Sequence, residues 1–428
     1  MSQDISRRSW LCSAAGAALG LGITSLDKGN LLGAAWEENR AVREPRARSV
    51  IYLYMGGGMT HVDTFDPKPE NKDVQGPLEV IEGATSGMRF GQHMVRTAKQ
   101  SKNLCVINSM STTQGAHEQG NYFMHTSYEL RGTIQHPSLG SWVSRELGRR
   151  NPELPASVLI NGGSDHPERG YFEMEHQPLR VDNPEDGLSH SKRPKYIAEN
   201  RYQTRLDLLN RFNAGYEKKN PTSAVKDYKE SYNAALKLMT SRDLEAFDLS
   251  KENEILREAY GKNDFGQGCL LARRMVERGV RFAEVQLNGW DFHNDCFGRL
   301  DEQAPILDNA LGTLLEDLEQ RGMLQDTMVV LGTEFGRTPD INSRELGRDH
   351  FPKAFSCLVA GGGAKGGHVH GKTDKDAKNV IEGSVGPMDL NATIAYAMGL
   401  DLNKIIYSPS KRPFQVAHKG KPVLELFG

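Results

Sequence analysis

Short apolar runs, separated by polar and glycine-rich stretches, recur along the chain. Continuous apolar runs bounded by turn residues are typical of strands that are buried on both faces. The clearest examples are SVIYLYM, which three glycines follow, and TMVVLGT, which runs into a Glu. Strands are predicted at residues 49–55, 103–110, 156–162, 281–287, 327–333 and 355–362.

Helical patterns occupy the stretches between these runs. Apolar residues recur at steps of three and four through residues 199–280 and again in residues 304–322 and 389–400. Strands that alternate with helices favour a mostly parallel sheet with helices on both faces. The predicted fold class is therefore α/β, with one domain over residues 49–428 and a helical insertion at about residues 199–280.

The N-terminus predicts an export signal. SRRSWL places Arg7, Arg8 and Trp10 ahead of a mildly apolar Ala/Gly/Leu stretch, and this arrangement resembles a twin-arginine signal peptide. We expect residues 1–35 to be the signal and residues 36–48 a linker, which predicts a secreted, periplasmic or extracellular protein. Two alternatives stay open: a signal retained as a membrane anchor, and an N-terminal helix of the fold.

Composition and net charge mainly exclude classes of partner. Hydrophobic residues make up 38% of the chain, charged residues 25%, and the formal net charge is −2. These values fit a globular protein and give no overall field that attracts nucleic acid. We expect no nucleic-acid partner and no membrane span in the mature chain. The cysteines beyond the signal are widely spaced, so their pairing stays open.

Polar clusters follow three of the predicted strands: THVD, WDFHND and EFGRTP…GRDH. In open parallel sheets, ligands bind at the carboxyl ends of the strands. Carboxylate and imidazole groups together suit Zn²⁺ or Mn²⁺ better than Ca²⁺. The predicted metal ligands are Asp291, His293, Glu334 and His350, with His61 and Asp63 as weaker candidates. The alternative is ordinary surface polarity, with charges near a helix start and weak ion pairs.

Several long motifs resemble one family of secreted proteins, the domain-of-unknown-function family 1501 (DUF 1501). They include GGMTHVDTFDPKP, WDFHND and TEFGRTPDIN…GRDHFP, and they occur in order over nearly the whole mature chain. That family is similar to a distant branch of the alkaline phosphatase and sulfatase superfamily. The resemblance implies metal ligands at strand ends, with Asp291 and His293 as an Asp-plus-His pair, Glu334 replacing an Asp, and His350 as a late His.

The chain also departs from the superfamily pattern. Glycines 56–58 stand where the first strand normally ends on a metal-binding Asp, and Phe335 stands where a His is expected. The usual nucleophile position falls near Ser111, Thr112 and Thr113, without a clear match. His117 is the functional-looking residue there.

These observations predict a metal-dependent hydrolase of a sulfate or phosphate ester, on a small molecule or a polysaccharide. His117 would act as general acid or base, because its pKa lies near working pH. Arg337 and Arg348 would hold the anion through planar guanidinium groups; the alternative for Arg337 is a pairing with Glu334 or a main-chain carbonyl. A second hypothesis is a secreted binding protein that keeps the fold without catalysis.

Overall fold

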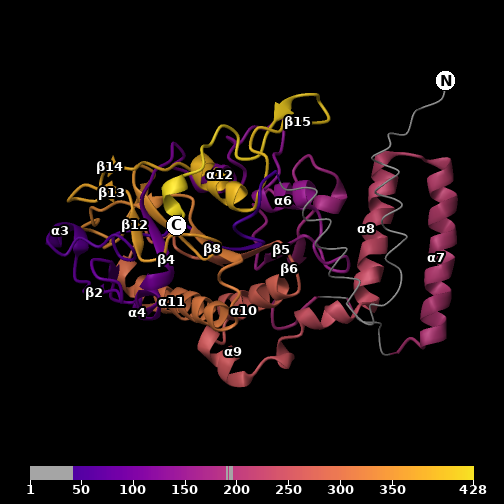
Figure 1. The fold of residues 1–428 in the computed structure, drawn as a ribbon, viewed down its shortest axis with the longest axis horizontal. Coiled ribbons are helices and arrows are strands. Elements are labelled where there is room, and N and C mark those ends of the chain that lie inside the picture. The colour runs from indigo at the N-terminus through magenta and orange to yellow at the C-terminus, as the bar shows by residue number, and fades with distance from the viewer. Residues whose placement is uncertain (1–41, 189–190, 192–195) are drawn as a thin grey trace, which may run out of the picture. The chain divides into compact units, whose positions relative to one another are not determined.

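The computed structural model describes residues 42–188, 191 and 196–428. The predicted signal and residues 36–41 of the predicted linker lie outside these residues. Within them, the largest sheet has eight strands in the order β12-β4-β11-β8-β1-β7-β5-β6 (Figure 1). The strands are β1 (Ser49–Gly56), β4 (Leu104–Met110), β5 (Ser157–Ile160), β6 (Leu179–Val181), β7 (Phe282–Asn288), β8 (Thr327–Gly332), β11 (Phe355–Ala360) and β12 (His368–His370).

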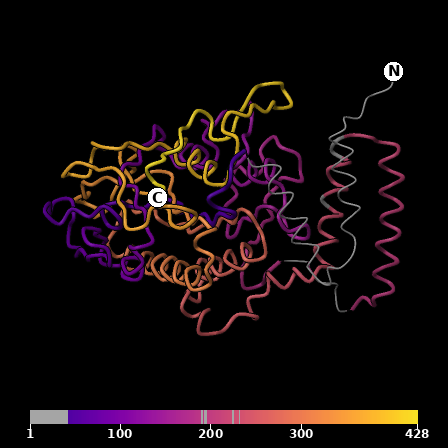
Figure 2. The backbone as a smooth tube through the Cα atoms, viewed as in Figure 1, coloured from indigo at the N-terminus to yellow at the C-terminus, as the bar shows by residue number. Residues whose placement is uncertain are grey.

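Strand directions confirm the predicted, mostly parallel sheet. β1 pairs in parallel with β7 on one side and with β8 on the other, and β5 continues the parallel set. β11 runs antiparallel to both β4 and β8. Figure 2 shows how the first strand of the chain, in indigo, lies between segments from the orange C-terminal half. Residues far apart in sequence therefore share the sheet centre.

Helices cover both faces of the sheet, as predicted. Alternate residues of β1 face opposite sides, because side chains on a strand alternate. Ile51 and Leu53 belong to the core cluster that includes α10 (Asp264–Glu277) and α11 (Cys296–Gln320). Tyr52 and Tyr54 belong to the cluster that includes α6 (Leu139–Leu147) and α12 (Pro387–Ala397). Figure 1 shows these two pairs of helices on opposite sides of the sheet.

The range 199–280 is helical, and its parts differ in their packing. It contains α7 (Glu199–Lys219), α8 (Ser223–Thr240), α9 (Glu254–Tyr260) and α10. α10 packs directly on β7 and β1 and is buried along most of its length, so it belongs to the central core. α7 contains no buried residue and contacts α8.

Shorter elements complete the described chain. The remaining helices are α3 (Lys72–Gln75), α4 (Val95–Lys99) and α5 (His117–Thr126). The remaining strands are β2 (Val80–Glu82), β3 (Arg89–Gly91), β9 (Gly336–Arg337), β10 (His350–Phe351), β13 (Lys372–Thr373), β14 (Val380–Glu382), β15 (Ile406–Tyr407) and β16 (Pro413–Phe414). Cys105, Cys269, Cys296 and Cys357 are buried and carry free thiols. Among the described residues, no helix combines the length and apolarity that crossing a membrane requires.

Candidate metal centre

The carboxyl ends of β1, β7 and β8 meet at one edge of the sheet, because these strands are parallel neighbours. Asp291 and His293 lie in the loop after β7, and Glu334 follows β8. His350 opens β10, which pairs with β9 just beyond β8. His117 is the first residue of α5, which follows β4. The four predicted metal ligands and His117 are thus brought to the same edge.

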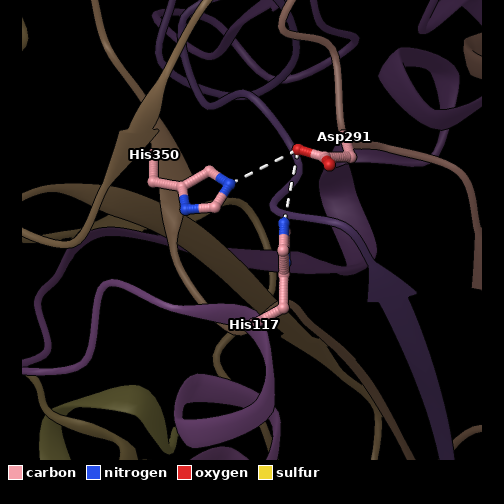
Figure 3. A group of neighbouring side chains, drawn as sticks. All are labelled: His117, Asp291 and His350. Carbon is pink, nitrogen blue, oxygen red and sulfur yellow. Dashed lines mark ion pairs between the residues drawn. The ribbon is translucent and has the colours of Figure 1, made fainter.

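One oxygen of Asp291 is the centre of this cluster. Three imidazole nitrogens approach Asp291 Oδ1: His293 Nε2 at 3.1 Å, His117 Nε2 at 3.3 Å and His350 Nε2 at 3.4 Å. Figure 3 shows His117 and His350 pointing at Asp291 from two sides. The side chains come from β10, from α5 and from the loop after β7. The structure therefore assembles three histidines and one carboxylate.

The other nitrogen of each ring is held by an acceptor. His117 Nδ1 lies 2.8 Å from Glu334 Oε1, and His293 Nδ1 lies 2.9 Å from Asp349 Oδ1. His350 Nδ1 lies 2.9 Å from the carbonyl oxygen of Gly115. An ionised carboxylate or a carbonyl can only accept, so each ring donates from Nδ1. In the neutral rings, all three Nε2 lone pairs then face the same space.

Nitrogen lone pairs that face one another repel, and a cation between them would relieve this repulsion. His293 Nε2 lies 3.1 Å from His350 Nε2, although neither neutral ring has a proton there to donate. His117 Nε2 is buried and makes no hydrogen bond within the described chain. Ligands of a tetrahedral zinc ion, each about 2.0–2.1 Å from it, stand roughly 3.3 Å apart. The separations of 3.1–3.4 Å from Asp291 Oδ1 are close to that spacing. His117, Asp291 and His350 each offer a ligand atom within 4.8 Å of the other two, and His293 reaches this group through Asp291 Oδ1 and His350 Nε2.

The neighbourhood keeps Asp291 ionised. Burial opposes its ionisation, but the hydrogen bond and charge of Arg337 outweigh burial and lower the pKa of Asp291 to about 2. The hydrogen bond and charge of Glu334 raise the pKa of His117. Phe335 packs against the rings of His117 and His350, with centroids 5.0 and 4.7 Å apart. Phe335 therefore forms an apolar wall where the superfamily pattern implies a ligand.

Glu334 takes a different position from the one predicted. Its Oε1 accepts from the backbone N–H of Gly57 at 2.8 Å as well as facing His117 Nδ1, and its Oε2 accepts from the hydroxyl of Tyr54 at 3.1 Å. Both oxygens are thereby engaged away from Asp291. Glu334, predicted as a ligand, is therefore not among the groups that face Asp291 Oδ1: it orients His117, whose Nε2 faces that oxygen.

Arg337 and Arg348 do not face the open part of the site. Arg337 is fully buried and donates to the carbonyls of Gly57, Gly58 and Arg348 and to Asp291. Arg348 donates to Asp63 at 2.9 Å and to three backbone carbonyls. The prediction that these guanidinium groups hold a substrate anion is therefore not supported by their placement, because their donors are used inside the protein. For Arg337, the alternative of a main-chain carbonyl partner is the one found.

The weaker candidates lie outside the cluster. His61 is fully buried, and its Nε2 contacts the carbonyl oxygen of Ala377 at 3.1 Å. Asp63 is buried too and accepts from Thr60 and Arg348. Both residues stabilise the loop after β1, where the glycines at 56–58 let the backbone approach Glu334 and Arg337. At Gly57, a Cβ atom would lie 2.6 Å from the backbone nitrogen of Asp291.

Sequence reasoning missed a second group of imidazole and carboxylate side chains. Glu284 on β7 is buried between His125, with Oε1–Nε2 of 2.9 Å, and His166, with Oε2–Nε2 of 3.3 Å. His166 Nδ1 accepts from the backbone N–H of Glu168 at 3.0 Å, so its proton sits on Nε2 and points at Glu284. That proton occupies the position a metal would need. The group is therefore a hydrogen-bonded ion cluster beneath α5, and the sole sequence signal was an interior Glu in a strand.

Comparisons with solved structures return distant similarities. The PsFucS1 sulfatase from Pseudoalteromonas sp. is 12% identical, with 88% of this chain and 72% of that chain covered and a TM-score of 0.36. The phosphonate monoester hydrolase SpPMH from Silicibacter pomeroyi is 11% identical, with coverages of 88% and 76% and a TM-score of 0.40. The lipoteichoic acid synthase LtaP from Listeria monocytogenes is 10% identical, with coverages of 92% and 79% and a TM-score of 0.36.

Sequence comparison gives the family. No curated protein sequence matches the chain. The family model described as "Protein of unknown function (DUF1501)" matches residues 47–427, which confirms the resemblance drawn from the motifs. Since this match covers far more than half of its length, the chain belongs to the DUF1501 family.

Proposed function

We propose that this protein is an exported, metal-dependent hydrolase of a sulfate or phosphate ester. His117, His293, His350 and Asp291 would hold one divalent ion, Zn²⁺ or Mn²⁺ in preference to Ca²⁺. The observation that carries the proposal is the convergence of three Nε2 lone pairs on Asp291 Oδ1, each with its Nδ1 tied to an acceptor. Metal-binding histidines are held in this way in proteins.

An ion in this site would polarise an ester oxygen and lower the pKa of a bound water. The chain's residues prepare that chemistry. Arg337 keeps Asp291 ionised, and Glu334, Asp349 and the Gly115 carbonyl fix the three ring orientations. The four side chains keep 26–44% of their surface exposed, although His117 Nε2 itself is buried, so an ester and water would approach from the side of Asp291, His293 and His350. His117 then serves as a ligand in place of the predicted general base.

Export through the twin-arginine route is part of the proposal and rests on the SRRSWL motif. This route carries proteins that are already folded, which suits an ion bound before export. The site of action would be the periplasm or the cell exterior.

A non-catalytic binding protein is the second candidate, and one observation favours it. The hydroxyls near the usual nucleophile position contact neighbouring residues: Ser111 contacts Ser384 at 3.3 Å, and Thr112 and Thr113 contact Gln114. Such a protein would bind the ion and turn over no ester. Hydrolysis with a water nucleophile needs none of these hydroxyls, so turnover separates the two candidates.

Metal content is the first experiment. Purified protein is expected to contain about one equivalent of Zn or Mn, and His293→Ala is expected to lose it. His368→Ala, on the edge strand β12, is the matched control and should keep the ion. A metal-free wild type, even after Zn²⁺ or Mn²⁺ is supplied, would contradict the metal site. A panel of sulfate and phosphate esters then tests turnover.

A further inference from the structure

A cavity of about 770 Å³ lies beside the metal centre. It is lined by the loop at 111–113, the end of α5 with the segment that follows it, the start of α12, and β16. Its volume falls within the range of about 300–1,000 Å³ that is usual for small-molecule sites. None of the proposed metal ligands lines it. The cavity is therefore a second binding space rather than part of the ion's immediate surroundings.

Two arginines at this cavity have weakly engaged guanidinium groups. Arg131 and Arg412 are exposed, and their nearest polar contacts are 3.5 Å long, to Glu129 Oε2 and to Thr133 Oγ1. Contacts of this length between exposed groups contribute little. This distinguishes them from Arg337, whose donors are consumed by the protein interior. Arg131 and Arg412 are thus able to turn their donors toward a bound anion.

The electrostatics of the lining agree with an anionic ligand. Burial and then the charge of Arg131 lower the pKa of His136 to about 4. Burial lowers the pKa of His418, and the charges of Lys419 and Arg131 act in the same direction. Both imidazoles are therefore neutral at pH 7, and the arginines supply the charge. Glu129 at the rim is the opposing carboxylate, and it is exposed to solvent.

Rings form the floor of the cavity. Tyr128 and His136 stack with centroids 4.3 Å apart and an interplanar angle of 7°. Phe414 packs edge-on against both rings, at 5.4 and 4.9 Å. The hydroxyl of Tyr128 donates to the Gln415 carbonyl at 2.7 Å, which ties the residue after β16 to these rings. The aromatic floor suits the apolar face of a ring, and the arginines and hydroxyls around it suit an anionic group on that ring.

The cavity is connected to the metal centre through two short pieces of chain. The backbone N–H of Thr112, which lines the cavity, donates to the carbonyl of Pro352 at 2.9 Å, two residues beyond His350. α5 begins at His117 and carries Phe123, which also lines the cavity. A helix rises about 1.5 Å per residue, so these two positions are about 9 Å apart along its axis. That separation suits a ring next to the one whose ester reaches the ion.

We propose that this cavity is a subsite for a neighbouring anionic ring of the substrate, a sulfated sugar unit, with Arg131 and Arg412 holding its sulfate. The inference rests on the proposed ester hydrolysis for the identity of the substrate, but binding in the cavity requires no turnover. A sugar ring offers an apolar face to the floor and hydroxyls to Ser111 and Thr113. A polysaccharide chain with repeated sulfates would then be held at two points.

Equilibrium binding tests this subsite independently of catalysis. The probe is a sulfated tetrasaccharide, titrated calorimetrically into His293→Ala, which lacks the proposed ion site and so cannot turn over the probe. The double substitution Arg131→Gln/Arg412→Gln in that background is expected to weaken binding by roughly tenfold or more, because charge-assisted hydrogen bonds are lost. Arg205→Gln/Arg211→Gln, two exposed arginines on α7, is the matched control and should bind unchanged.

Two further probes assign the ligand. The unsulfated tetrasaccharide is expected to bind at least tenfold more weakly than the sulfated one. The aryl ester 4-nitrophenyl sulfate is also expected to bind more weakly than the sulfated tetrasaccharide. Equal binding of the two tetrasaccharides would overturn the role of the arginines, and tighter binding of the aryl sulfate would overturn the sugar assignment. Failure of the sulfated probe to bind His293→Ala, while the wild type contains its metal ion, would refute the subsite and leave the hydrolase proposal standing.

Discussion

Glu334 Oε1 lies 2.8 Å from His117 Nδ1, and this contact turns the other nitrogen of the ring toward Asp291, where Nε2 stands 3.3 Å from Oδ1. Glu334 is itself fixed by the Gly57 N–H and the Tyr54 hydroxyl. The carboxylate therefore sets both the tautomer and the direction of His117. A residue that would never touch the ion thus decides whether one of its ligands is available.

Glu334→Gln tests this relationship. An amide can still accept from His117 through its oxygen but no longer carries a charge. The tautomer with the proton on Nδ1 and the lone pair on Nε2 is then less strongly favoured. We expect metal affinity to fall by about 10–100-fold, as is usual when such a partner is removed. Competition with a chromophoric chelator measures it. Glu118→Gln, the exposed neighbour on α5, is the control, and equal affinity in both variants would contradict the orienting role.

Chelation gives a second prediction. A ligand that binds only the folded state stabilises it by about 2.7 kcal/mol when present at 100 times its Kd. EDTA is therefore expected to lower the Tm of the wild type by several degrees. His293→Ala should already melt at the lower temperature and should not respond to EDTA. A wild type whose Tm is the same with and without EDTA, and with added Zn²⁺ or Mn²⁺, would argue against a bound ion.

Arg337→Met is expected to destabilise the protein. Arg337 is fully buried and satisfies the carbonyls of Gly57, Gly58 and Arg348 as well as Asp291. Removing the guanidinium leaves carbonyl acceptors unsatisfied, at about 1–3 kcal/mol for each buried one, while Asp291 stays partly exposed to water. Urea unfolding at neutral pH measures the loss. Arg205→Met on exposed α7 should change the free energy of unfolding by less than about 0.5 kcal/mol.

Much of the fold and part of the site could be predicted from the sequence. The apolar runs located the main strands, and the rule that parallel strands bind ligands at their carboxyl ends brought Asp291, His293 and His350 together. His117 was harder to place, because it follows β4, which is separated from β8 by the antiparallel β11. The distance between two strands along the sequence does not tell which strands are neighbours in the sheet.

Side-chain direction was the part that the sequence could not supply. Arg337 and Arg348 stand beside the metal ligands in the chain, which suggested an anion clamp. In the structure, both turn inward, because the glycine loop after β1 and the loop at 338–339 present bare carbonyls that need donors. The same loop supplies the Gly57 N–H to Glu334 and so converts a predicted ligand into an orienting group.

The buried cluster under α5 predicts a specific dependence of stability on pH. Burial opposes the charge on Glu284, but His125 and His166 outweigh it, and the pKa of Glu284 is lowered. Burial likewise opposes the charge on His125, but Glu284 outweighs it, and the pKa of His125 is raised. A lowered carboxyl pKa gives stability that is present above its unfolded value of about 4.3 and lost as pH falls. A raised imidazole pKa gives stability that is present below about 6.5 and lost as pH rises through the folded value.

Both contributions are therefore complete together only between about pH 4.3 and 6.5. The difference in unfolding free energy between wild type and Glu284→Gln should peak in that window, at about 1–3 kcal/mol, since Gln loses the charge and keeps a single acceptor oxygen for the two imidazole N–H donors. Urea titrations at pH values from about 4 to 9 measure the difference. Glu316→Gln, on the exposed side of α11, supplies the baseline. If the difference in unfolding free energy did not vary with pH, Glu284 and His125 would not form an ion pair in the folded protein.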